Sequence, residues 1–261
     1  MIEKPPTLIE LESVGSAYEN LSTSTDEKYL LPGKLVQSPD LSMPLIDAIR
    51  TRRTVRSYNS KKVPFEVFQR IIDMSSHAPT ACNEQRWKVI YIDDPEILNE
   101  LYLRGSAAFI KKTKQAFLLL YNNRITNFEH LDHVQSASAF INTFSLISHS
   151  LGIGSCWVCH MPRKKELRKM FGIHKYYDPI AIIPFGYYKD KVKIKPRKRN
   201  SDNMISKNTF EFKSLNFSPN KNIYARRIFI YIYYRIPPYI RKKIRRVTLP
   251  YEKKFYNEVY D

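Results

Sequence analysis

The sequence predicts an α+β fold in which a mixed sheet is flanked by helices, with extended arms at both ends of the chain. Short runs rich in β-branched and aromatic residues alternate with longer stretches whose apolar residues recur every three or four positions. The chain has 261 residues, of which 43% are hydrophobic, so it can bury a sizeable core. No internal repeat is visible, and helices alternating with a few strands are typical of a layered fold.

Composition divides the chain into three parts. Residues 1–43 are rich in Ser, Thr, Glu and Pro, carry seven acidic and three basic side chains, and show little periodicity, so we expect an N-terminal arm. Residues 44–200 contain the periodic helices and strands and form the predicted domain. Residues 201–261 form a C-terminal extension, whose last part, 221–261, carries eleven basic and three acidic side chains.

The predicted elements of the domain follow in a regular order. A helix begins near Pro44, and a second begins at Pro64 and ends near 75–77. Further helical patterns are expected at 95–103, 106–113 and 132–151. Strands are expected at 87–92, 116–121, 153–158 and 180–187. Between the last helix and the strand that follows it, Gly152 suits a helix C-cap and Gly154 would allow close approach of a backbone or ligand.

The densest chemical motif is residues 50–56, Arg-Thr-Arg-Arg-Thr-Val-Arg, hereafter the arginine turn. Guanidinium groups offer planar, paired donors, and threonine hydroxyls can fill further lone pairs, so the turn suits a dianionic phosphate. The alternative is a solvated basic turn, since the whole chain has a formal net charge of +18. That charge indicates an acidic partner, which could be phosphate, nucleic acid or anionic lipid.

Three cysteines, Cys82, Cys156 and Cys159, are too few for a disulfide scaffold and indicate a reducing compartment. Cys156 and Cys159 have the spacing of a redox or zinc-binding pair. Trp157 and Val158 between them continue a strand, however, so buried structural cysteines are favoured.

The location of the protein is predicted from its N-terminus and its longest uncharged run. The N-terminus lacks the basic start and apolar core of a secretory signal. The uncharged run, 134–162, contains too many serine, threonine and asparagine residues for a membrane span. We therefore expect a cytoplasmic protein, with peripheral membrane contact as an option for the basic C-terminal extension.

Four motifs in this order resemble the FMN-dependent nitroreductase family: Arg52–Arg56, Ala78–Trp87, Leu151–Trp157 and Pro196–Arg199. The resemblance covers residues 44–200 and implies a nitroreductase-like fold, a homodimer with FMN bound between subunits, and NADH or NADPH as co-substrate. It implies electron transfer to a small organic acceptor, either nitroaromatic- or quinone-like or a biosynthetic intermediate. Because the flavin carries the chemistry, no catalytic acid or base is assigned.

The resemblance also implies roles for individual residues. In the family, the first basic motif and a late basic pair hold the FMN phosphate; here these residues are Arg52, Arg53, Thr54, Arg56, Arg197 and Arg199. The loop that lies along the flavin supplies Pro79, Thr80 and Asn83. The strand that passes the flavin ring supplies Trp157, Val158 and Cys159. This chain departs from the family pattern at Arg86, where the family usually has proline.

The C-terminal extension leaves three interpretations open. Residues 226–246 interleave apolar and aromatic side chains with arginine and lysine, and the uncharged run 228–234 is too short to span a bilayer. The extension could pack as an arm over the other subunit, lie on an anionic membrane, or, least favoured, bind nucleic acid. The alternative to an enzyme is a flavin-poor basic module that attaches to a membrane or nucleic acid through 221–261.

Overall fold

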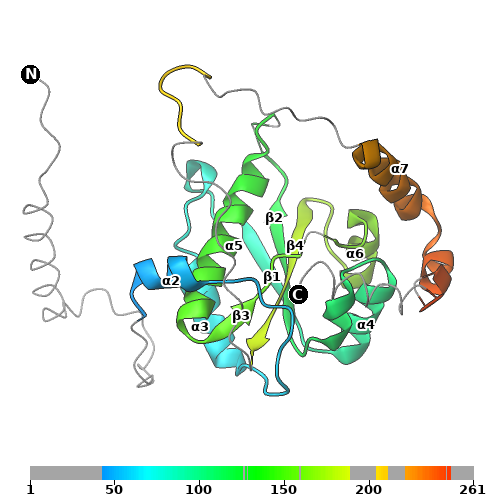
Figure 1. The fold of residues 1–261 in the computed structure, drawn as a ribbon, viewed down its shortest axis with the longest axis horizontal. Coiled ribbons are helices and arrows are strands. Elements are labelled where there is room, and N and C mark those ends of the chain that lie inside the picture. The colour runs from blue at the N-terminus through cyan, green and yellow to red at the C-terminus, as the bar shows by residue number, and fades with distance from the viewer. Residues whose placement is uncertain are drawn as a thin grey trace, which may run out of the picture. The chain divides into compact units, whose positions relative to one another are not determined.

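The computed structural model describes residues 43–125, 127, 129–158, 160–188, 204–210, 221–244 and 246–247. Three predicted site residues, Cys159, Arg197 and Arg199, lie outside the described residues, as does the predicted N-terminal arm up to residue 42. The elements in chain order are α2 (Leu45–Thr51), α3 (Phe65–Ser75), η2 (Ala81–Asn83), β1 (Trp87–Ile92), α4 (Pro95–Leu103), η3 (Ala108–Lys112), β2 (Ala116–Asn122), α5 (Asp132–Ser150), β3 (Ile153–Ser155), α6 (Lys164–Phe171), β4 (Tyr177–Tyr187) and α7 (Lys221–Arg235) (Figure 1).

The four strands form a sheet in the order β1-β2-β4-β3, with every neighbouring pair antiparallel. The register of β2 against β4 shifts beside Leu120, whose partner is Pro179. Proline cannot donate a hydrogen bond to the ladder, so the irregularity accommodates it. A parallel bridge between Thr54 and Ser155 joins the arginine turn to β3. All other pairing among the described strands is antiparallel.

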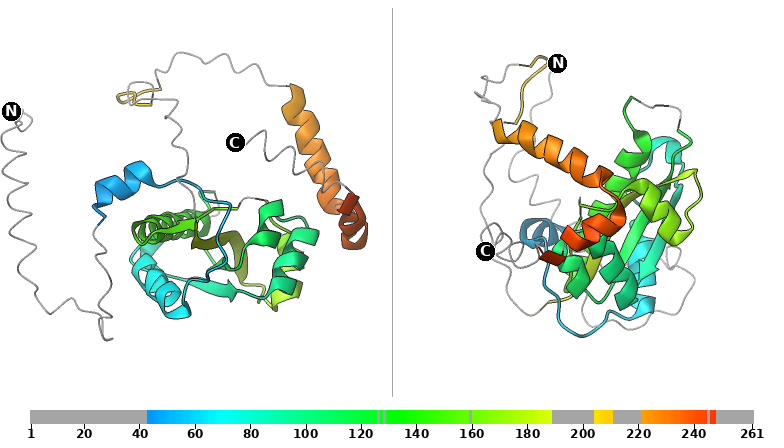
Figure 2. Two further views of the ribbon diagram at one scale, coloured as in Figure 1. Left: turned by 60° about the horizontal axis from the view of Figure 1, so that its bottom comes forward. Right: turned by 90° about the vertical axis from the view of Figure 1, so that its right-hand side faces the viewer.

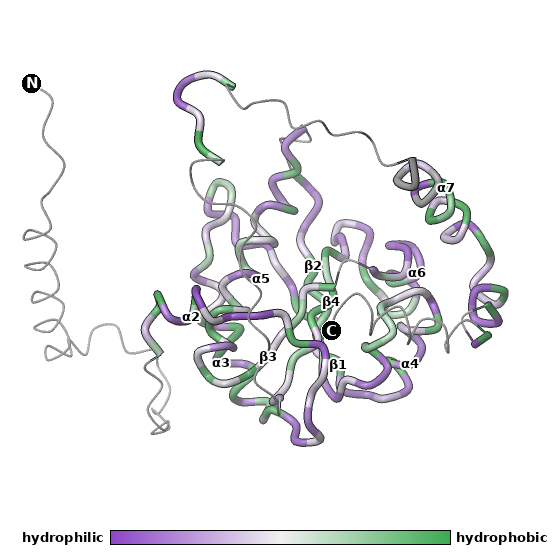
Figure 3. Tube along the Cα trace, viewed as in Figure 1, coloured by the Kyte–Doolittle hydropathy of each residue, from purple (hydrophilic) through white to green (hydrophobic). Residues whose placement is uncertain are grey.

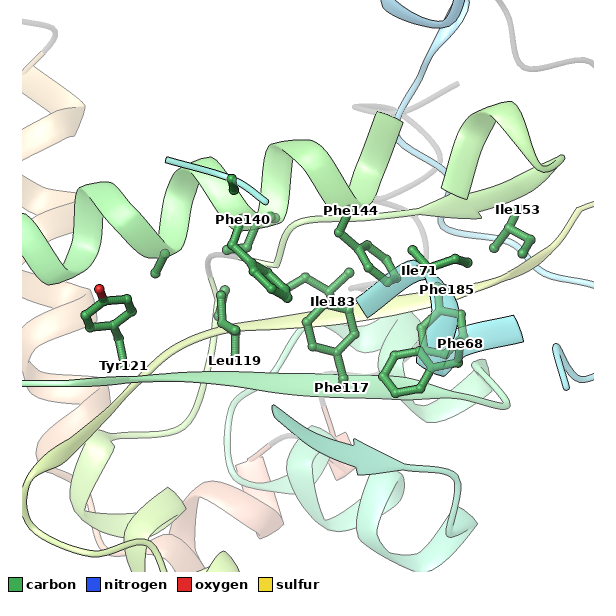
Figure 4. Close-up of a cluster of buried hydrophobic side chains, with 14 of the residues drawn as sticks. Phe68, Ile71, Phe117, Leu119, Tyr121, Phe140, Phe144, Ile153, Ile183 and Phe185 are labelled. Atoms are coloured by element: carbon green, nitrogen blue, oxygen red, sulfur yellow. The ribbon is translucent and has the colours of Figure 1, made fainter. Parts of the chain in front are cut away.

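Strand β2 separates two hydrophobic clusters because its successive side chains point to opposite faces. Phe117, Leu119 and Tyr121 pack with α3 and α5, as Figure 4 shows for the cluster around Phe117. Ala116, Leu118 and Leu120 pack with α4, η3 and α6. Helices therefore cover both faces of the sheet, and the predicted α+β class is confirmed.

Most elements match the sequence prediction, and the differences have local causes. β1 and α4 have the predicted bounds, and the segment predicted at 106–113 is the 3-10 helix η3. β4 begins at Tyr177, earlier than predicted, because the register shift admits Pro179 into the strand. The sequence analysis missed α6 and α7. α6 is short and mostly charged, with only Leu167 buried, so its few apolar residues did not stand out in the sequence.

Candidate functional site

The arginine turn follows α2 and runs alongside β3. Val55 donates its N–H to the Ser155 carbonyl at 3.0 Å, and Thr54 forms the parallel bridge with Ser155. The Tyr58 hydroxyl lies 2.7 Å from the Val55 carbonyl and 2.9 Å from the Pro184 carbonyl. Burial raises the pKa of Tyr58, so the hydroxyl stays protonated as a donor. The turn is thus fixed to the sheet by its backbone and by the Tyr58 hydroxyl.

Gly154 permits this close approach. A Cβ atom at position 154 would lie 2.6 Å from Cγ2 of Val55 and 2.8 Å from Cδ1 of Tyr188, closer than side chains can pack. Gly152, just after α5, has φ +69°, in the left-handed region that favours glycine at a helix end. Both roles predicted for these glycines are confirmed, and the partner at Gly154 is the arginine turn itself.

Three arginines of the turn, Arg52, Arg53 and Arg56, are half-buried. Arg53 Nη1 donates to the carbonyls of Arg50 and Arg52, each at 2.7 Å. The Arg56 guanidinium lies 6.0 Å from the centre of the Phe109 ring in η3. The turn therefore collects guanidinium groups between α2 and η3, at the edge of the sheet where β3 lies.

His149, in the last turn of α5, joins this group and was missed by the sequence analysis. Its Nε2 lies 2.8 Å from Thr51 Oγ1, which also contacts the Asp47 carbonyl at 2.5 Å. Burial lowers the pKa of His149, and the charges of Arg52 and Arg53 lower it further. Arg52 and Arg53 therefore contribute positive charge close to His149. The sequence offered one signal for His149: it lies three residues before Gly152, where the chain turns from α5 into β3.

The loop 79–85 lies at the other end of α5. Its Ala81 N–H donates to Ser136 Oγ at 3.1 Å. Cys82, Asn83 and Gln85 have φ values of +51°, +54° and +49°, all in the left-handed region without glycine. Strained backbone of this kind clusters at ligand-binding sites. The loop is therefore a candidate binding element with a geometry of its own.

Side chains within this loop position one another. Asn83 Oδ1 accepts a hydrogen bond from Gln85 Nε2 at 2.6 Å. Thr80 Oγ1 accepts one from the Gln85 N–H at 3.3 Å. Pro79 and Asn83 are exposed and Thr80 is half-buried. Two of the three predicted loop residues, Thr80 and Asn83, are thus joined through Gln85.

The structure does not bring this loop to the arginine turn within one chain. The loop contacts Ser136 near the start of α5, whereas the turn contacts His149 near its end. Thirteen positions separate these two residues, so at a rise of 1.5 Å per residue they lie about 20 Å apart along the helix. Figure 1 shows α2, which leads into the turn, alongside α5. The predicted site is therefore split into two halves.

The stretch after β3 belongs to the arginine-turn half. The N–H groups of Cys156 and Val158 donate to the carbonyls of Pro184 and Ile182, both at 3.1 Å. Successive amides of an extended strand point to opposite edges, so the Trp157 amide faces away from β4, toward the edge where the arginine turn pairs. The Trp157 side chain is 42% exposed, whereas Val158 and Cys156 are buried. Of this stretch, Trp157 presents the most surface to a ligand.

The comparison with known protein families covers both halves of the candidate site. The model of the nitroreductase family matches residues 49–129 and 129–187, more than half of the chain. The chain belongs to the nitroreductase family. The match includes the arginine turn, the loop 79–85 and the whole four-stranded sheet. The family resemblance stated from the sequence motifs is confirmed.

Nitroreductase relatives resemble the chain over the same region. A Methanothermobacter thermautotrophicus protein, provisionally named NADH dehydrogenase/NAD(P)H nitroreductase, is 29% identical over 149 residues, which are 56% of this chain and 78% of the relative. An Archaeoglobus fulgidus protein with the same provisional name is 30% identical over 151 residues, 55% of this chain and 84% of the relative. The solved structure of an FMN-dependent nitroreductase from Clostridium difficile is 23% identical, with a TM-score of 0.56, and covers 63% of this chain and 99% of that one. The last likeness shows the shared fold.

Proposed function

We propose that this nitroreductase-family protein is an FMN-dependent oxidoreductase that takes electrons from NADH or NADPH and passes them to a small organic acceptor. The acceptor would be nitroaromatic- or quinone-like, or a biosynthetic intermediate. The observation that carries the proposal is the arginine turn fixed to β3 beside His149. Family membership supports the oxidoreductase class. Bound FMN would supply two-electron transfer, and the protein would bind and orient it.

The arginine turn fits the phosphate of FMN. A phosphate needs several charged or polar donors on a fixed backbone, and Arg52, Arg53, Thr54 and Arg56 provide them within five positions. His149 supports this assignment only in part: burial is the main cause of its lowered pKa, and the charges of Arg52 and Arg53, which a dianion would offset, lower the pKa further. The pair Arg197 and Arg199, predicted to complete the phosphate site, lies outside the described residues and stays a prediction.

The ring of FMN would lie where Trp157 is presented. The Val158 N–H is already bonded to the Ile182 carbonyl, so it is not available to a flavin. The Trp157 amide, on the opposite edge of the same strand, is the remaining described donor of this stretch. We therefore assign orientation of the ring to Trp157, and keep Val158 as the buried residue that holds the strand on β4.

A homodimer would close the site. One chain places its arginine turn and its loop 79–85 at opposite ends of α5, so we infer that a single flavin draws on the turn of one subunit and the loop of the other. A two-fold axis would place the loop of one subunit against the turn of the other. Exposed apolar side chains on α2 next to the turn, Leu45, Ile46 and Ile49, support a subunit contact there, since they are 65%, 56% and 50% exposed.

The absorbance spectrum of the purified protein tests the function. A yellow protein that is bleached by NADH or NADPH under anaerobic conditions is expected, and a colourless protein that binds no added FMN would contradict the proposal. The double substitution Arg52→Ala and Arg56→Ala should lower flavin occupancy strongly. The matched control Arg70→Ala with Lys88→Ala removes the same charge from exposed positions of α3 and β1 and should leave occupancy unchanged.

Mixed dimers test the arrangement of the site. One subunit would carry Arg52→Ala and Arg56→Ala, and the other Thr80→Val and Asn83→Ala. If each site combines the turn of one subunit with the loop of the other, one site of the mixed dimer stays intact and half of the flavin is retained. If each site lies within one chain, both sites are damaged and flavin is lost.

A further inference from the structure

The C-terminal segment, residues 221–247, is anchored to the nitroreductase domain by a buried arginine. Arg241 is fully buried, donates from Nη1 to the Arg104 carbonyl at 2.8 Å and from Nε to the Ile236 carbonyl at 3.0 Å, and pairs with Glu166 of α6. The Tyr233 and Tyr234 rings lie 6.0 Å from its guanidinium. The segment is therefore held by directional polar contacts to the Arg104 carbonyl and to Glu166. Figure 2 shows the course of α7 and of the helical residues after it.

A second ion pair supports the anchor. Lys242 Nζ lies 2.8 Å from Glu100 Oε1 on α4, and Arg104 bonds the same carboxylate. Burial alone would raise the pKa of Glu100, but hydrogen bonds from Lys242 and Arg104, with their charges, outweigh burial and lower it. The carboxylate is therefore charged near neutral pH, and the segment is tethered at both α4 and α6.

The anchor leaves much of the apolar surface of the segment open. Exposed side chains of the segment include Ile228, Phe229, Tyr231, Ile232, Tyr239 and Val247. Figure 3 shows this hydrophobic character along α7 and the residues after it. Exposed apolar groups on this scale mark an interaction surface rather than ordinary scattered exposure.

The charge of the segment is uniform in sign. Residues 221–247 contain nine lysines or arginines and no aspartate or glutamate. Arg227 and Arg235 are exposed on either side of the apolar run 228–234. Among the described helices, none is long and apolar enough to cross a membrane. The segment thus combines exposed aromatic and aliphatic groups with basic groups, at a length that suits a surface rather than a span.

We propose that the C-terminal segment binds the surface of a bilayer that contains anionic lipids, and so holds the domain at the membrane. Aliphatic and aromatic side chains of the segment would enter the boundary between headgroups and acyl chains. Arginine and lysine would extend to the lipid phosphates, which favour basic segments at this depth. The buried Arg241 would fix the orientation of the domain relative to the bilayer. This role goes beyond the proposed oxidoreductase function and does not depend on it.

Two other occupants fit the segment less well. A second copy that met the segment through its own segment would bring two basic surfaces together, and interface cores are depleted in lysine and in charge generally. A second copy that met the segment through its domain is tested by the molecular mass below. Nucleic acid would satisfy the basic groups and stack on tyrosines, but it offers no partner for exposed Ile228 and Ile232. An anionic bilayer satisfies both the charges and the aliphatic groups.

Vesicle flotation of the full chain tests the proposal. The protein should float with vesicles of phosphatidylcholine and phosphatidylglycerol, stay in solution with pure phosphatidylcholine, and dissociate as salt rises. Equal binding to both vesicle types, or no binding to either, would overturn the proposal. The double variant Phe229→Ser with Ile232→Ser gives a further test. If its molecular mass in solution fell while its flotation stayed the same, a second copy of the chain would be the partner of this surface, and the proposal would be wrong.

Charge and apolar variants separate the two contributions. Arg227→Glu with Arg235→Glu should weaken binding to the anionic vesicles by roughly a hundredfold or more at low salt, since each basic group near the surface contributes a several-fold gain. Arg70→Glu with Lys88→Glu makes the same change in net charge on exposed residues of α3 and β1 and should weaken binding far less.

Phe229→Ser with Ile232→Ser should also lose flotation, while flavin content stays that of the wild type. If this apolar variant floats as the wild type does, the proposal is wrong. The proposal is also wrong if the variant binds duplex DNA as tightly as the wild type binds vesicles, because nucleic acid would then be the partner. Met74→Ser with Leu131→Ser, which removes exposed apolar groups elsewhere, is the matched control. A protein without flavin that still floats would overturn the proposed enzyme function and leave the membrane contact standing.

Discussion

The sheet with its flanking helices differs from the C-terminal segment in which residue types are buried. Around the sheet, Phe68, Phe117 and Phe185 are buried against one another, with Phe68 and Phe185 stacked 5.1 Å apart. In the C-terminal segment, Phe229 is 67% exposed, while an arginine, Arg241, is fully buried. The first region is stabilised by packing among many partners, and the second is attached through a few charged groups. A substitution in the first region should therefore lower the stability of the whole domain, whereas a substitution in the second should affect only the attachment of the segment.

Loss of Phe117 should break the first region. Phe117→Ala removes a fully buried ring from the middle of β2, where it packs on Phe144 at 4.6 Å between ring centres, so it should lower the free energy of unfolding by about 3–5 kcal/mol. Urea denaturation followed by fluorescence measures the change. Phe229→Ala, the same substitution at an exposed position, should change stability by less than about 0.5 kcal/mol. A similar cost for both would mean that α7 is covered by protein in solution.

Loss of Arg241 should release the second region and spare the first. Arg241→Ala leaves Glu166 without its partner and should cost about 3 kcal/mol, confined to attachment of the C-terminal segment. Hydrogen exchange of α7 should rise sharply while exchange of β2 stays slow. Arg235→Ala, at an exposed position, is the control and should leave both rates unchanged. If exchange of β2 rises as much as that of α7, the two regions unfold together.

A side chain at position 154 should separate the arginine turn from the sheet. Gly154→Ala places a Cβ atom 2.6 Å from Val55 Cγ2, so the turn must shift, at a cost of about 1–3 kcal/mol. Flavin retention should fall more than stability does, because the phosphate site moves while the core stays packed. Gly172→Ala provides a control: that position has a left-handed φ but nothing near its Cβ, so it should cost stability without loss of flavin. If Gly154→Ala retained full flavin, the arginine turn would not be part of the cofactor site.

The smallest expected effect is a pH dependence that resides in the first region. His133 is buried beside Asp178, and burial lowers its pKa, an effect that Asp178 partly offsets. The Nε2 to Asp178 distance of 3.8 Å is therefore a contact of a neutral ring near pH 7. A histidine with a lowered pKa gives stability that is complete above its unfolded pKa of about 6.5 and declines as pH falls below it.

Unfolding midpoints measured between pH 7 and pH 5 should therefore fall in the wild type. The fall should be smaller in His133→Asn, whereas His77→Asn, an exposed control, should behave as the wild type. Asp178 adds to the loss only at lower pH. Burial alone would raise its pKa, but hydrogen bonds from Lys164 and Asn123 and the charges of Lys164 and Arg168 lower it. Its contribution is thus present above the unfolded carboxyl pKa and is lost as pH falls through the folded one. A midpoint that does not change with pH in the wild type would contradict this.

The sequence by itself determined the features that depend on neighbouring residues. The bounds of β1 and α4 followed from periodicity and from Asp94, whose side chain accepts the Glu96 N–H at 2.8 Å as a helix cap. The arginine turn followed from composition, and the role of Gly152 followed from its place at a helix end, because both are local. The sequence also indicated a close approach at Gly154, but not that Val55 is the partner. The family followed from motif order.

Only the tertiary structure decided which of these features meet. His149 and Thr51 are 98 positions apart, Arg241 and Glu166 are 75 apart, and no local pattern pairs them. In sequence, Arg241 is one member of a basic run, and only the folded chain buries it while leaving Arg235 exposed. The two halves of the proposed flavin site are likewise at opposite ends of α5. Burial and contact depend on how distant segments pack, so these outcomes appear only when the chain is folded.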